Sequence, residues 1–191
     1  MNARQWLHNR IVAALLPVFL ACAVLSPAGA EDVAKLDDLF SRLATTVDAA
    51  EAGRIEAEIW LEWAKSGSPS MDLLYRRGQE AMEMGNTQAA IEHFSAIIDH
   101  DPAFTEAWNA RATAYYSAGE IGPSVADIAH VLQANPRHFG ALAGLAMILE
   151  ESDRPEKALE VYRAAAAIHP FMAGVNDAIE RLEKTLEGQE L

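Results

Sequence analysis

The chain has 191 residues, with 28 acidic and 15 basic side chains and a formal net charge of -13 at pH 7. A chain this acidic repels nucleic acid and anionic lipid surfaces, which argues against both as partners. Its one cysteine, Cys22, cannot form an intrachain disulfide, so stability has to come from packing.

Residues 1–30 have the order typical of an export signal. A basic start, MNARQWLHNR, precedes the apolar run IVAALLPVFLACAVL, and SPAGA then places small residues at Ala28 and Ala30. This order predicts a signal peptide, residues 1–30, cleaved after Ala30. Loss of Arg4 and Arg10 with the leader would change the net charge from -13 to -15. A mature chain this acidic and without cysteine favours a bacterial periplasm or secretion as its location.

Two alternatives for this leader stay open. An uncleaved leader would anchor the protein in the inner membrane, although the apolar run, residues 11–25, is short for a span and contains Pro17. Alternatively, Cys22 would be a lipoprotein acylation site, although Phe19-Leu20-Ala21 before it does not follow the usual Leu-led pattern. After cleavage we expect no stable membrane insertion.

Residues 31–70 contain two amphipathic segments, DVAKLDDLFSRLATTVDAA and EAGRIEAEIWLEWAK. Their apolar residues recur at helical spacing, and SGSP ends the second segment. The spacing from Pro69 to Pro102 is close to the interval found in the rest of the chain. The segment is therefore predicted to be a degenerate helical hairpin that caps the N-terminal end of the following array.

From residue 71 the sequence repeats itself at a fixed interval. The three blocks are residues 71–104, 105–138 and 139–172, and each ends near a proline: Pro102, Pro136 and Pro170. In each block two apolar stripes at helical spacing flank a break, which predicts an antiparallel pair of helices. Small residues recur where the two helices of a pair must approach closely: Gly78, Ala90, Ala112, Ser124, Ala146 and Ala158.

The breaks and the C-terminal end fit this interpretation. Gly85 and Gly119 lie in the breaks, while Pro123 and Pro155 fall in the opening turn of the second helix, where a missing amide hydrogen costs little. Residues 173–191 are predicted to form a closing helix, over 174–187, and a tail. Its half-polar pattern is what the last hairpin of an array needs over its exposed stacking face.

Three consecutive helical hairpins at this interval, with Trp, Gly or Ala, Tyr, Ala, Phe and Pro at these offsets, resemble tetratricopeptide repeats. The resemblance covers residues 71–172 and implies an all-α fold, a right-handed α-solenoid of stacked antiparallel hairpins. It also implies that the first helices of the hairpins line a concave groove that binds a peptide or another protein, with no catalytic residue, cofactor or metal.

The resemblance further indicates which side chains face the groove. The candidate binding residues are Tyr75, Arg76, Gln79, Met82, Asn109, Thr113, Tyr116 and Met147. In the class of this family that clamps an acidic C-terminus, lysine, arginine and asparagine form the clamp, and only Arg76 and Asn109 match it here. Because the predicted groove face carries five acidic groups against one basic group, we expect a neutral or basic, partly extended ligand.

Features that suggest chemistry have structural explanations. His100, His138 and His169 adjoin the helix-ending prolines, where a histidine interacts favourably with a helix C-terminus. We find no metal-ligand spacing, phosphate-binding loop or Ser/His/Asp arrangement in the sequence. The acidic side chains near Glu150 are typical of a solvated surface, and Trp60 and Trp108 are assigned to packing.

Arg77 and Arg111 share one offset in successive blocks, at a position that often faces inward. A buried arginine needs a partner, so we predict an ion pair between Arg111 and Asp127. These inferences together predict a non-catalytic scaffold for protein or peptide binding. The alternative is a structural, self-associating component of an envelope complex, which would make the protein a homo-oligomer.

Overall fold

The computed structural model describes residues 27–189, which are α-helical with short connections and contain no strand. Residues 1–26, most of the predicted leader, lie outside this part. The helices are α1 (Pro27–Thr45), α2 (Ala49–Trp63), α3 (Pro69–Glu83), α4 (Thr87–His100), α5 (Thr105–Ser117), α6 (Ile121–Ala134), α7 (Phe139–Glu151), α8 (Pro155–Ile168) and α9 (Val175–Gln189). The predicted all-α class is confirmed. Among these helices, none has the length and apolar content needed to cross a membrane.

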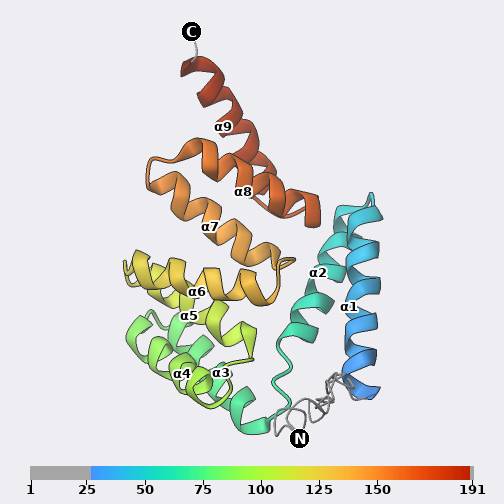
Figure 1. The fold of residues 1–191 in the computed structure, drawn as a ribbon, viewed down its shortest axis with the longest axis vertical. Coiled ribbons are helices and arrows are strands. Elements are labelled where there is room, and N and C mark those ends of the chain that lie inside the picture. The colour runs from blue at the N-terminus through green and yellow to red at the C-terminus, as the bar shows by residue number, and fades with distance from the viewer. Residues whose placement is uncertain (1–26, 190–191) are drawn as a thin grey trace, which may run out of the picture.

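Three hairpins, α3–α4, α5–α6 and α7–α8, stack in chain order, and α9 packs on α8 (Figure 1). Each hairpin turns at an equivalent residue with positive φ: Gly85 at 72°, Gly119 at 78° and Asp153 at 56°. The next amide in each case donates back to the first helix, as Asn86 does to the carbonyl of Ala81 at 2.8 Å. This closure needs a left-handed residue, and aspartate tolerates that conformation better than most side chains do.

The predicted close approaches of helices have a clear physical reason at Gly78. A Cβ atom at this position would lie 2.4 Å from Cε1 of the Phe94 ring. Phe94 is almost fully buried and forms the centre of the first repeat's core. A side chain larger than hydrogen at residue 78 would therefore displace the main aromatic ring of that core.

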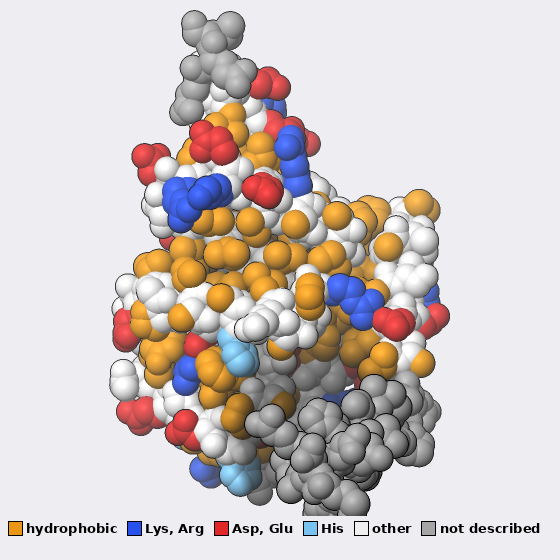
Figure 2. Space-filling view, viewed as in Figure 1, with side chains coloured by type: hydrophobic (Ala, Val, Ile, Leu, Met, Phe, Trp, Pro, Cys, Tyr) orange, Lys and Arg blue, Asp and Glu red, His pale blue; other side chains and the backbone are white. Residues whose placement is uncertain are grey.

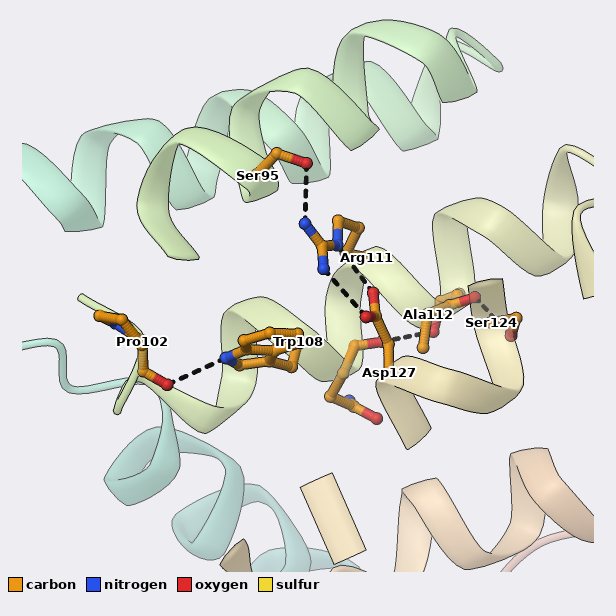
Figure 3. Close-up of polar contacts among 9 residues, drawn as sticks. Ser95, Pro102, Trp108, Arg111, Ala112, Ser124 and Asp127 are labelled. Carbon is orange, nitrogen blue, oxygen red and sulfur yellow. Dashed lines mark hydrogen bonds and ion pairs between the residues drawn. The ribbon is translucent and has the colours of Figure 1, made fainter. Parts of the chain in front are cut away.

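The predicted ion pair is present within the second repeat (Figure 3). The Arg111 guanidinium donates to both carboxylate oxygens of Asp127, from Nε at 2.7 Å and from Nη2 at 2.9 Å, and its Nη1 donates to Ser95 of α4 at 3.0 Å. This fork raises the pKa of Arg111 further and keeps it charged. Arg77, at the same offset in the first repeat, is exposed instead.

The α1–α2 hairpin is present, but it does not stack on the first repeat as an N-terminal cap would. Figure 1 shows it standing beside the array, with its far end against α8. The hairpin core, which includes Leu39, Leu43, Ile55 and Ile59, extends to Phe139 at the start of α7. A short connection, residues 64–68, lets the hairpin lie away from α3 and cover apolar side chains of the third repeat.

We expect replacement of Arg111 by Ala to lower the free energy of unfolding by about 3 kcal/mol, because it leaves a buried carboxylate without its partner. The Asp127 side chain is only 6% exposed, so water cannot substitute for the guanidinium. Chemical denaturation of the purified variant measures the loss. In Arg111→Met/Asp127→Leu, which removes both charges and keeps the volume, most of the stability should return. An unchanged midpoint for Arg111→Ala would contradict a structural role for the pair.

Candidate binding site

A cavity of about 680 Å³ separates the N-terminal hairpin from the first repeat. Helix α2 and its C-cap residue form one wall, the α2 wall, with Ala57, Trp60, Leu61 and Ala64. Helix α3 forms the other wall with Asp72, Tyr75, Arg76 and Gln79. Glu106 of α5 completes the lining. We call this space the α2–α3 cavity. It exists only because α2 lies beside the array and not at its end.

The α3 wall combines a packed aromatic ring, Tyr75, with two exposed polar side chains, Arg76 and Gln79. The Tyr75 ring packs against Phe94 and Phe104, with both centroid separations at 5.6 Å. Burial and the nearby Glu106 carboxylate raise the pKa of Tyr75 well above its ordinary value, so it stays neutral. Arg76 and Gln79 are exposed, so both are available to a ligand.

The α2 wall is held in place by aromatic contacts with the start of α7. The Trp63 ring stacks on His138 at 4.4 Å and 13°, and Trp60 meets Phe139 edge-on at 5.5 Å and 83°. A Cβ atom at Gly140 would lie 2.9 Å from Cη2 of Trp60. Glycine at this position is therefore what lets the indole lie against the α7 backbone.

His138 joins this aromatic cluster to the cavity. Its Nδ1 accepts the amide hydrogen of Ala141 at 3.0 Å, so the proton lies on Nε2, which donates to Oε1 of Glu106 at 3.0 Å. The histidine is fully buried, and Glu106 is 2% exposed. The prediction that His138 interacts with a helix C-terminus is wrong, because its side chain caps the N-terminus of α7.

Two polar contacts add to the aromatic docking of the hairpin. Nη2 of Arg137 donates to Asp37 of α1 at 2.8 Å, and the Arg137 guanidinium also lies 4.3 Å from the centroid of the Phe40 ring. His169, the C-cap residue that follows α8, is buried, and its Nε2 lies 3.2 Å from Oε2 of Glu56 in α2. The hairpin is thus attached at α1 to the connection between α6 and α7, and at α2 to the residue that follows α8.

A second, much smaller pocket of about 70 Å³ lies between α5 and α7. It holds four of the predicted groove residues: Asn109, Thr113, Tyr116 and Met147. The Tyr116 hydroxyl donates to Glu151 at 2.6 Å, which raises the pKa of Tyr116. Its volume is about one tenth of that of the α2–α3 cavity.

The structure thus divides the eight predicted groove residues. Tyr75, Arg76 and Gln79 line the α2–α3 cavity, the four residues above surround the small pocket, and Met82 packs on the core of the first repeat. Arg76 and Asn109, the two residues that match the carboxylate clamp, line separate spaces.

The sequence interpretation missed the four side chains of the α2 wall. The one available signal was Leu61, an apolar residue between Trp60 and Glu62 that is 68% exposed in the structure. The carboxylates near Glu150 are engaged as expected of a surface, since Glu150 pairs with Arg181 and Glu151 accepts from Tyr116. In the described part of the chain, no three acidic, histidine or cysteine side chains are placed to hold a metal ion.

Comparison with known proteins places this geometry in context. A sequence model of the tetratricopeptide repeat matches residues 75–122 and 124–173. A tetratricopeptide repeat-containing protein of Rhizobium etli is 36% identical over 154 residues, which are 81% of this chain and 76% of that protein. The match therefore extends well beyond the three repeats.

Solved structures share the fold at low sequence identity. The first tetratricopeptide repeat domain of Spaghetti, bound to an HSP90 peptide, superposes with a TM-score of 0.58 at 17% identity, over 61% of this chain and 95% of that one. The MamA protein gives a TM-score of 0.55 at 18% identity, over 81% of this chain and 82% of that one. These similarities support the predicted repeat solenoid.

We expect replacement of Gly140 by Ala to loosen the α1–α2 hairpin while leaving the repeats folded. The new methyl group would overlap the Trp60 ring, and overpacking of this kind costs ~1–3 kcal/mol. Amide hydrogen exchange in α2 should accelerate about tenfold, with protection in α4 unchanged.

Gly144→Ala is the matched control, because it adds the same methyl group to the same helix. Its Cβ would meet its nearest neighbour, Cδ1 of Ile128, at an ordinary 3.8 Å. Equal exchange rates in the two variants would show that Trp60 does not depend on Gly140.

Proposed function

Because this chain belongs to the tetratricopeptide repeat family, we propose that it is a non-catalytic scaffold that binds a peptide segment of another protein. The proposed binding site is the α2–α3 cavity. The observation that carries this proposal is the composite wall of α2, which turns the open side of the first repeat into a space of about 680 Å³. Ligand sites of this size bury several side chains.

The lining of the cavity suits an extended peptide. Trp60, Leu61 and Tyr75 offer apolar surface, while Gln79 offers both a donor and an acceptor for a ligand backbone. The α2 wall is fixed by the contacts of Trp60 and Trp63 with α7, so little ordering cost is added when a ligand binds.

The charges of the cavity favour a neutral or basic ligand. Asp72 and Glu106 stand against Arg76 among the lining residues. Glu106 is 2% exposed and hydrogen-bonded to His138, whereas Asp72 is half-buried and accepts one hydrogen bond from Ser66. Asp72 is therefore the principal carboxylate available to a ligand cation. Long-range attraction by a chain of net charge -13 adds to this preference.

The comparisons support peptide binding in general, since the Spaghetti domain that shares the fold was solved with an HSP90 peptide. A carboxylate clamp is not favoured in this chain, because Arg76 and Asn109 line different spaces. We therefore propose that the cavity selects side chains along a segment and not a free C-terminus.

We also propose that the protein is exported, with the leader removed after Ala30, and acts in the periplasm or outside the cell. The packed side chains of α1 begin at Leu36, so cleavage leaves the hairpin core intact. An uncleaved leader that anchors the protein in the inner membrane is the competing possibility.

The processing site is tested by intact mass of the protein expressed with its own leader in a Gram-negative host. We expect the mass of residues 31–191 in the periplasmic fraction. Ala28→Leu should block cleavage, because the processing site requires a small side chain. Cys22→Ser should change nothing. Retention of residues 1–30 would support the anchor, and an acylated Cys22 would support a lipoprotein.

The ligand preference is tested with two fluorescein-labelled hexapeptides of alternating Leu and Ala that differ only in carrying two Lys or two Glu residues. By fluorescence anisotropy near physiological salt, we expect the Lys peptide to bind about tenfold more tightly. Asp72→Lys should remove this preference.

Glu83→Lys is the matched control, because it makes the same change of net charge on α3 at an exposed position outside the cavity. An equal loss in both variants would reduce the effect to net charge. Identical affinity of the two peptides, unchanged in Asp72→Lys, would contradict binding in the cavity. Concentration-dependent sedimentation without peptide binding would favour the self-associating scaffold.

A further inference from the structure

A second hollow, of about 410 Å³, lies between α6 and the α7–α8 hairpin. It shares no lining residue with the α2–α3 cavity. On α7 it extends from Leu145 to Ser152, toward the opposite end of the helix from Gly140, where α2 docks. We call it the α6–α8 groove.

The repeat register explains why this junction is hollow. Leu145 and Val161, which line the groove, occupy the offsets of Arg111 and Asp127 one repeat earlier. In the second repeat that pair reaches across to Ser95 of α4 and fills the junction between repeats. The third repeat has two shorter apolar side chains at these offsets, and the space beside them stays open.

The floor of the groove is apolar and partly uncovered. Ile121 at the start of α6 is 36% exposed, and Val125, one turn later, is half-buried, as are Leu145 and Val161. Figure 2 shows an apolar band across α6, α7 and α8, with basic side chains along its edge. Contiguous apolar surface of this kind marks a site of interaction with another protein.

The edge of the groove carries positive charge in an otherwise acidic protein. Arg154 precedes the first residue of α8, at the offset where Asn86 caps α4 with its side-chain oxygen. A cation at the positive end of a helix is unfavourable unless an anion lies nearby, and Glu156 in the first turn of α8 is such an anion. Within residues 27–189, neither Arg154 nor Lys157 forms an ion pair, and Glu160 is the one carboxylate in the groove lining.

We propose that the α6–α8 groove binds an acidic amphipathic helix of a partner protein. Leu145 to Ser152 spans about two turns, or roughly 10 Å of helix at ~1.5 Å per residue. A partner helix of that length places apolar side chains on Ile121, Val125 and Leu145 and directs carboxylates to Arg154 and Lys157. The scaffold then holds two segments of opposite charge preference at separate sites.

The test uses two labelled amphipathic helical peptides, each about four turns long, that share the same Leu positions and carry either Glu or Lys on the polar face. By fluorescence anisotropy the Glu peptide should bind the full mature protein about tenfold more tightly than the Lys peptide. Arg154→Glu/Lys157→Glu should reverse this order, and Ile121→Asp should weaken both peptides. Binding of the Glu peptide should also fall as salt is raised.

Lys184→Glu/Arg163→Glu is the matched control, because it makes the same change of net charge at exposed residues outside the groove. It should leave the order of the peptides unchanged, and Asp72→Lys should not weaken binding of the Glu peptide. The two tests are therefore independent. Failure of the hexapeptide test does not contradict this proposal, and failure of the helical-peptide test does not contradict peptide binding in the α2–α3 cavity.

Three results would overturn the proposal. The first is equal affinity for the two helical peptides. The second is the same reversal in the control variant, which would reduce the effect to overall charge. The third is concentration-dependent sedimentation of the protein alone that Ile121→Asp abolishes, because a second copy would then occupy the groove.

Discussion

The imidazole of His138 connects parts of the molecule that are far apart in the sequence. One ring face stacks on Trp63 of α2, Nδ1 caps α7, and Nε2 donates to the buried carboxylate of Glu106 in α5. A neutral ring in one tautomer satisfies both hydrogen bonds at once, which is why the residue is tolerated without exposure to water. The position of α2, and with it the wall of the α2–α3 cavity, depends on this side chain and Gly140, together with the contacts of Phe139, Arg137 and His169.

The α2–α3 cavity arises from a departure from the repeat pattern. Asp72, Glu106 and Gly140 share one offset in the three repeats, yet each meets the hairpin differently. Asp72 lines the cavity, Glu106 lies buried at its edge and bonds His138, and the absence of a side chain at Gly140 leaves room for Trp60. The same repeat offset therefore supplies both the acidic residues of the cavity and the contact with Trp60 that places its α2 wall.

The sequence predicted the features that depend on local period, and it did not predict those that depend on distant contacts. The hairpins, the close approach at Gly78 and the pair of Arg111 with Asp127 all follow from helical spacing within one repeat. The docking of α2 depends on residues such as Trp63 and His138, which lie in different hairpins far apart in the chain, and the repeat period contains no information about that contact. Met82 was assigned to the groove because it lies on the predicted helix face, but it packs on the core of the first repeat, since a long side chain on that face can also turn back onto the core.

The two inter-repeat junctions show how one scaffold provides different surfaces. Stacking of the hairpins depends on small residues such as Ala112 and Ala146, both of which are buried, and these are kept in successive repeats. The residues at the junction between successive repeats vary independently of these small residues. Arg111 and Asp127 seal one junction with a charged fork that spans three helices, while Leu145 and Val161 leave the next junction open and apolar. The small residues that keep the helices close and the residues at the offsets of Arg111 and Asp127 are different. Replacing a charged pair at those offsets by apolar residues therefore alters what the surface can bind without altering the fold.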